Sequence, residues 1–74
     1  MAKHVSGARV ANGCYVRVQD LAGNTGPESR FAFASDGATQ TFTFNWTNPP
    51  SPIETLVFGA DSATIYLVSD LQIA

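Results

Sequence analysis

Apolar and polar side chains alternate along most of this chain, and that alternation restricts it to β structure. The longest run, residues 39–46, puts three aromatic side chains on one face and only threonine and asparagine on the other. A period of two is that of a strand with one face against a core. No window of eleven residues has the helical spacing i, i+3, i+4, i+7, so we expect essentially no helix. Strands are predicted at residues 14–20, 30–34, 39–46, 54–58 and 63–68, with a shorter one within residues 5–10.

Turn-forming residues separate these runs at intervals of about 8–12 residues. They are Asn12-Gly13, Gly23-Asn24, Asp36-Gly37 and the Gly-Ala-Asp-Ser stretch at 59–62. Glycine and asparagine tolerate positive φ, and aspartate bonds its own backbone, so these residues favour tight reversals. We therefore predict an all-β fold, a small antiparallel β-sandwich or barrel of five to six short strands.

The chain is short, and its 74 residues hold a single domain, residues 1–74, with little core of its own. Small domains usually gain stability from disulfides, metals or partners. Cys14 is the only cysteine, so no disulfide forms within the chain, and the single histidine offers no His/Cys metal site. We expect stabilisation by oligomerisation, with a homotrimer favoured, and an N-terminal arm at residues 1–12 in contact with neighbours. No cofactor is expected.

Charged residues make up 14% of the chain, against about 25% in an ordinary soluble domain. A surface with so little charge is typical of one that a partner covers. The formal net charge of −2 argues against a nucleic-acid partner, which needs a basic patch. The three arginines are interpreted as separate solvated residues or members of interface salt bridges; they are Arg9, Arg17 and Arg30.

The hydropathy of the chain bears on its location. No segment approaches the roughly 20 apolar residues of a membrane span, so no membrane association is predicted. The N-terminal residues also lack the apolar run of about 7–15 residues that a secretion signal needs. The protein is expected to be made in a host cytoplasm and to enter a virion, or otherwise to stay cytoplasmic; a free Cys14 fits a reducing compartment.

No set of side chains predicts catalysis. A nucleophile needs a base and a group that orients it, and His4, the only histidine, falls in the expected N-terminal arm. Cys14 begins an alternating run and is interpreted as a small buried hydrophobe. Four aspartates coincide mostly with turns or strand ends, where Asp bonds the backbone; they are Asp20, Asp36, Asp61 and Asp70. We predict that the protein is not an enzyme.

The run at residues 63–68 is apolar on both faces, and one small core can cover only one of them. One face is assigned to the core and the other to a neighbouring subunit. Trp46, the only tryptophan, either covers the core or a subunit contact, or forms an exposed platform for a ligand. The residues predicted for the interface are Trp46, Tyr66, Val68, Tyr15, His4 and Val5.

The stretch from Tyr15 to Asn24, YVRVQDLAGN, resembles the strand and turn of bacterial Ig-like repeats. The final hairpin of those repeats often has an aspartate, two further residues and then Gly-Asn. The resemblance implies that a turn from Asp20 to Thr25 joins two antiparallel strands, and nothing further is taken from it.

Three prolines follow the longest run, in the segment Asn48-Pro49-Pro50-Ser51-Pro52. They donate no ladder hydrogen bonds and favour an extended polyproline path. The segment is therefore predicted to be a stiff crossover that carries the chain to Glu54, with Trp46 packed against it.

These inferences favour a non-enzymatic structural protein of a virus particle. The most specific hypothesis is a bacteriophage capsid decoration (cement) protein, or a tail-associated one, that stabilises an assembly by docking its β domain. Its partners would be copies of itself and a larger assembly such as a capsid. The alternative is a small binding module, either a carbohydrate-binding domain that uses Trp46, Tyr66 and Tyr15 or a phage-encoded inhibitor of a host protein.

Overall fold

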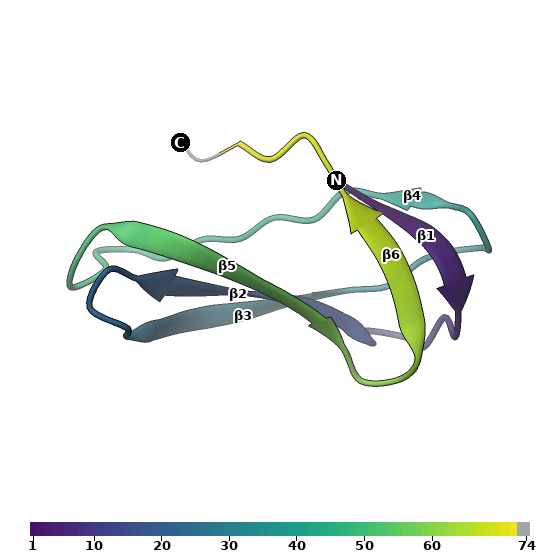
Figure 1. The fold of residues 1–74 in the computed structure, drawn as a ribbon, viewed down its shortest axis with the longest axis horizontal. Helices are drawn as coiled ribbons and strands as arrows, with labels where there is room; N and C mark the ends of the chain where they lie inside the picture. Colours follow the sequence, from purple (N-terminus) through teal and green to yellow (C-terminus); the bar gives the residue numbers. More distant parts are fainter. Residues whose placement is uncertain (73–74) are drawn as a thin grey trace.

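The computed structural model describes residues 1–72, which contain six strands and no helix. The strands form two three-stranded antiparallel sheets (Figure 1). Sheet A has the order β4-β1-β6 and sheet B the order β3-β2-β5. The predicted all-β, antiparallel class is confirmed. The strand bounds are β1 Ala2–Gly7, β2 Cys14–Asp20, β3 Thr25–Phe31, β4 Thr39–Gln40, β5 Ile53–Ala60 and β6 Thr64–Val68.

β2 is the central strand of sheet B, and its side chains explain that position. Val16 and Val18 are completely buried and Cys14 nearly so, while the residues between them are half-buried on the other face. β-Branched side chains suit a pleated surface packed on a core. β2 pairs with β3 on one side and with β5 along its whole length on the other. The strand predicted at residues 14–20 has the observed bounds.

The turn between β2 and β3 is closed by one aspartate. The backbone N–H of Asp20 donates to the Asn24 carbonyl (3.0 Å), and the Asn24 backbone N–H donates to Asp20 Oδ1 (2.7 Å). The Asn24 side-chain amide donates to Oδ2 of the same carboxylate (2.9 Å). Gly23 has φ of 88°, a conformation in which glycine is favoured. The antiparallel turn implied by the resemblance to Ig-like repeats is therefore present.

The N-terminal residues form part of the fold. β1 is the central strand of sheet A, bonded to β4 and to β6, so residues 2–7 are not an arm. The short strand expected within residues 5–10 begins three residues earlier. A β-bulge between His4 and Ser6 interrupts the pairing with β6, and it places Val5 and Ser6 together on the outer face.

The turn predicted at residues 59–62 begins later, because Gly59 and Ala60 are the last residues of β5. Two predicted strands depart furthest from the structure. The run at 30–34 is the end of β3 and the start of the following loop, although Phe33 stays buried beyond the last ladder residue. The run at 39–46 forms a ladder only at its first two residues, where Ala2 faces Gln40 and Lys3 faces Thr39. The reason is that β1 begins at Ala2, so the partner strand ends where the alternating run continues.

Residues 41–47 nevertheless keep the alternation. Phe42, Phe44 and Trp46 are half-buried, and the residues between them are exposed. The Phe42 ring stacks on Phe31 with centroids 5.1 Å apart, and it meets Phe58 of β5 edge-on at 5.5 Å. Figure 1 shows this segment crossing the molecule alongside sheet B, beyond the end of sheet A. It thus covers the inner face of sheet B where sheet A does not extend.

The proline-rich segment completes the crossover from sheet A to sheet B, as predicted. The Pro52 carbonyl accepts a hydrogen bond from the Leu21 N–H (2.8 Å), and the Ser51 hydroxyl accepts one from the Ala22 N–H (3.2 Å). Both donors lie in the β2–β3 turn. The segment is therefore fastened to that turn before β5 begins.

One hydrophobic core serves both sheets. Ala2 of sheet A and Cys14 and Phe31 of sheet B are buried in the same cluster, together with Phe33 from the β3–β4 loop. Tyr66 of β6 meets Phe31 edge-on at 5.6 Å. Edge-on and offset aromatic pairs add stabilisation beyond the area that they bury.

Candidate docking face

The six residues predicted for an interface do not share one surface. Val5 is exposed at the β-bulge, and His4 is buried beside it. The other four are half-buried: Tyr15 on the outer face of sheet B, Tyr66 and Val68 on β6, and Trp46 on the crossover segment. An interface role stays a prediction for these residues, and Val5 alone among them is presented to solvent.

The aromatic side chains proposed for sugar binding are also separated. Tyr66 points into the core, where its ring contacts Phe31 and Phe33. The Trp46 ring lies directly over Gly26 of β3. Tyr15 covers Gly59 on the outer face of sheet B. The three rings therefore form no common platform.

His4 is held at both ring nitrogens by the backbone. Its Nδ1 accepts a hydrogen bond from the Gly37 N–H (3.2 Å), and its Nε2 lies 3.1 Å from the Gly7 carbonyl, to which it donates. The ring also meets Phe33 edge-on at 5.4 Å. These contacts tie β1 to the β3–β4 loop and leave neither nitrogen open to a substrate.

Cys14 has the environment of a core residue. It is buried in the shared cluster. Burial raises the pKa of its thiol, and the negative charge of Asp61 raises that pKa further. A thiol is a nucleophile only as the thiolate, so this environment opposes nucleophilic chemistry at Cys14.

β6 presents opposite faces to the core and to solvent. Tyr66 and Val68 turn inward, and the Tyr66 hydroxyl donates to the Gly59 carbonyl across the core (3.0 Å). Burial raises the pKa of that phenol, which keeps it a donor. Ile65 and Leu67 turn outward and are 60% and 63% exposed. The sequence indicated two apolar faces, but it did not show which of them the core would take.

The outer face of sheet A combines three of the exposed apolar side chains. Leu67 lies opposite Lys3, and Ile65 lies opposite Ser6. Val5, 52% exposed, adjoins them because the bulge adds it to the same face. We call Val5, Ile65 and Leu67 the sheet A face. The outer face of an antiparallel sheet is usually polar, so an exposed apolar group on this face is unusual.

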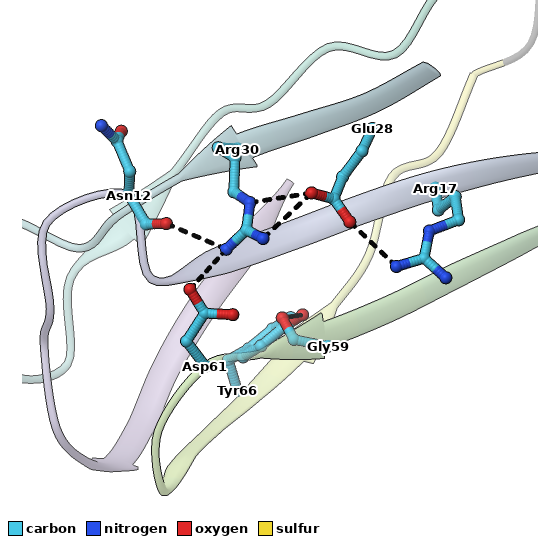
Figure 2. Close-up of polar contacts among 7 residues, drawn as sticks. All are labelled: Asn12, Arg17, Glu28, Arg30, Gly59, Asp61 and Tyr66. Carbon is cyan, nitrogen blue, oxygen red and sulfur yellow. Dashed lines mark hydrogen bonds and ion pairs between the residues drawn. The ribbon is translucent and has the colours of Figure 1, made fainter. Parts of the chain in front are cut away.

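The outer face of sheet B is different, because its charges are paired with one another (Figure 2). Arg17 Nη2 donates to Glu28 Oε1 (2.9 Å), and Arg30 contacts Glu28 Oε2 (3.0 Å). Arg30 Nη1 also donates to Asp61 Oδ2 (2.6 Å) and to the Asn12 carbonyl (3.3 Å). The network joins β2, β3 and the β5–β6 turn.

This network shifts the titration of its members. Hydrogen bonds from Arg17, and then Arg30, lower the pKa of the Glu28 carboxyl. The hydrogen bond to Asp61, and then that to Glu28, raises the pKa of the Arg30 guanidinium. Tyr15 lies between the two arginines, whose guanidinium carbons are 5.3 and 5.0 Å from its ring centroid. Arg9 stands apart and pairs with Asp36 (2.7 Å). Each of the three arginines therefore pairs with an acidic side chain of its own chain, and the predicted salt bridges at an interface stay a prediction.

Two shallow grooves lie near the ends of sheet A. One, of about 290 Å³, runs along Thr41–Phe44 and is bounded on its far side by Met1 and residues 70–72. The other, of about 360 Å³, lies between β5 and β6 and is lined mainly by Phe58, Tyr66 and Val68. Within residues 1–72, no cluster of three or more His, Cys, Asp or Glu side chains is placed to hold a metal ion.

Comparisons with known proteins add no assignment to these features. No protein-family model matches the chain, and no curated protein or solved structure matches it. Within the described residues there is no helix that is long and apolar enough to cross a membrane.

Proposed function

We propose that the two sheets form a small β-sandwich that acts as a non-enzymatic docking module, with the sheet A face as its contact surface. The observation that carries the proposal is the exposure of Val5, Ile65 and Leu67 together on one sheet. Burying such side chains against a partner releases about 25 cal/mol per Å² of apolar surface. The paired charges of sheet B offer no comparable gain.

The setting that we propose is a virus particle, with the module acting as a bacteriophage capsid decoration or tail-associated protein. The low charged fraction of 14% supports a surface that a partner covers. The single Lys3 beside the apolar side chains supplies a positive rim for an acidic partner surface. Function in this setting is mechanical: the domain stabilises an assembly by lying across its surface.

The test is co-sedimentation of the purified protein with bacteriophage capsids. Ile65→Lys together with Leu67→Lys places two charges in the centre of the face and is expected to weaken binding at least about tenfold. Both side chains point to solvent, so the fold should be retained, which circular dichroism checks.

A matched control carries the same added charge elsewhere. Thr55→Lys together with Ser62→Lys changes two exposed residues of β5 and the β5–β6 turn, and binding should stay near that of the wild type. A wild-type protein that does not bind, or a loss of binding that is equal in both variants, would contradict the proposal.

A further inference from the structure

Residues 41–47 form an extended segment that enters no ladder within residues 1–72. In the part of the chain that the structure describes, no backbone group from Phe42 to Pro50 makes a hydrogen bond to another residue. The side chains still alternate between half-buried and exposed, as they do in a strand. Figure 1 shows the segment continuing the line of β4 across the molecule. It therefore has the geometry of an edge strand that lacks a neighbour.

A groove lies beside this segment in the part of the chain that the structure describes. About 290 Å³ of free space separates Thr41–Phe44 from residues 70–72. Asp70, with φ of 54°, follows the Met1–Ser69 pair. In that pair the N-terminal ammonium group of Met1 donates to the Ser69 carbonyl, and the Ser69 N–H donates to the Met1 carbonyl. Residues 70–72 therefore border the segment, and no backbone hydrogen bond joins them to it.

The sequence of the segment lacks the devices that normally protect an edge. Natural proteins place lysine, proline, bulges or inward charges on such strands. Residues 37–53 contain no charged side chain at all, and the first proline is Pro49, after the alternating run has ended. A strand that lacks these features is prone to pair with the edge of another strand.

Charge and symmetry identify the partner. An uncharged strand is complementary to itself, because a two-fold axis brings each side chain opposite an equivalent face without like-charge repulsion. The outer face of the segment carries three threonines and one asparagine, at positions 41, 43, 47 and 45, and cross-strand threonine pairs are favourable. The antiparallel arrangement also keeps Phe42, Phe44 and Trp46 of each copy on the inner side, where they cover sheet B of the same copy.

We propose that residues 41–47 of two copies of this chain pair as antiparallel strands about a two-fold axis. The resulting dimer joins the crossover segments of the two domains into one two-stranded ribbon. This inference goes beyond the proposed function, because the dimer forms through residues 41–47 and not through the sheet A face. A two-fold pair also gives dimers, and not the trimer that the composition alone suggested.

The first test is sedimentation equilibrium of the full chain over a wide range of concentration. The wild type should dimerise weakly, since one strand pair is a small interface. Thr41→Lys together with Thr43→Lys puts like charges on both sides of the axis and should raise the dimer dissociation constant about tenfold or more. The Thr55→Lys/Ser62→Lys variant is the matched control and should leave that constant within about threefold of the wild type.

A charge exchange then tests self-pairing directly. Thr41→Glu with Thr43→Glu should also prevent dimerisation, and an equimolar mixture of the Lys and Glu variants should restore it. Hydrogen exchange gives the local readout: amides between Phe42 and Trp46 should become protected as the wild-type concentration rises.

Three results would overturn the proposal. They are a wild type that stays monomeric at every concentration, a dimer that the two lysines leave intact, and a segment protected only by an added extended peptide. The Ile65→Lys/Leu67→Lys variant separates this inference from the proposed function. It should lose capsid binding and keep the dimer, whereas the Thr41→Lys/Thr43→Lys variant should lose the dimer.

Discussion

Asp20 shows how one side chain can determine a local structure. Its carboxylate is almost fully buried, and it accepts two hydrogen bonds from Asn24 at the point where β2 reverses into β3. Burial alone would raise the pKa of this carboxyl. The hydrogen bonds, first from the Asn24 side chain and then from its backbone, lower the pKa below its ordinary value of 3.8.

This lowered pKa predicts an acid-sensitive contribution to stability. The stabilisation is complete above the ordinary pKa and disappears as the pH falls through that value toward the folded-state pKa. The wild type should therefore unfold at lower urea concentration near pH 3 than near pH 7. Asp20→Asn should be less stable at neutral pH and should lose less on acidification.

Asp70→Asn is the control for that experiment, because it replaces an exposed carboxyl outside the strands. Its urea midpoint should follow the wild type at both pH values. Equal acid sensitivity of the wild type and Asp20→Asn would refute the role assigned to the turn.

Gly26 is the second residue with a specific task. A Cβ at this position would lie 2.5 Å from two atoms of the Trp46 ring, so the ring rests on the bare backbone of β3. Gly26→Ala should displace Trp46 and destabilise the domain by about 1–3 kcal/mol. The emission of this single tryptophan should shift to longer wavelength, and acrylamide should quench it more strongly.

Gly37→Ala separates the contact from a general effect of losing glycine. Gly37 has φ of 74° and no atom near its would-be Cβ, so alanine strains the backbone there without touching Trp46. It should lower stability and leave the emission unchanged. An unchanged spectrum for Gly26→Ala would contradict the contact.

At the scale of elements, we expect the proline-rich crossover to act through stiffness. Pro50 is exposed, and its segment is held by the hydrogen bonds of Ser51 and Pro52 to the β2–β3 turn. Pro50→Gly removes no such bond but widens the conformational range of the unfolded chain. We expect a loss of about 0.5–1 kcal/mol in the free energy of unfolding, measured by urea denaturation.

The folded state should be unchanged in that variant, which the tryptophan emission reports. Pro50→Ala should fall between the wild type and Pro50→Gly, since alanine restricts the chain more than glycine does. A variant as stable as the wild type would show that the stiffness of the crossover contributes nothing.

The elements also show where sequence patterns are reliable. The bounds of β2 are those predicted, because its alternation continues between two neighbouring strands, β3 and β5. The run at 39–46 has a stronger alternation, yet only two residues enter a ladder. Alternation reports which face is buried; whether a strand has a neighbour depends on where another part of the chain begins, here β1 at Ala2.

At the scale of the whole molecule, the outer faces of the two sheets differ in the side chains that they carry. The arginines and acids of sheet B bond to one another, so that face is complete in the monomer. The sheet A face and the edge at residues 41–47 are the features that a partner would complete. They lie on different elements, which is why separate variants can test them.

The prediction of interface residues shows the limit of the sequence most clearly. The run at 63–68 was recognised as apolar on both faces, and the choice of Tyr66 and Val68 for the interface rested on nothing in the pattern. Ile65 and Leu67 are outward because Tyr66 has to reach Gly59 and the phenylalanine cluster. These contacts join β6 to β5, to β3 and to the β3–β4 loop, so no local sequence pattern could predict them.

The sequence by itself determined the β class, the β2–β3 turn and the buried face of β2, because periodicity and turn chemistry act between near neighbours in the chain. Only the tertiary structure decided that the N-terminal residues are the central strand of sheet A, that the best alternating run enters a ladder at only two of the described residues, and that β6 turns Ile65 and Leu67 to solvent. Those outcomes depend on which distant segments meet, and therefore on the packing of the complete chain.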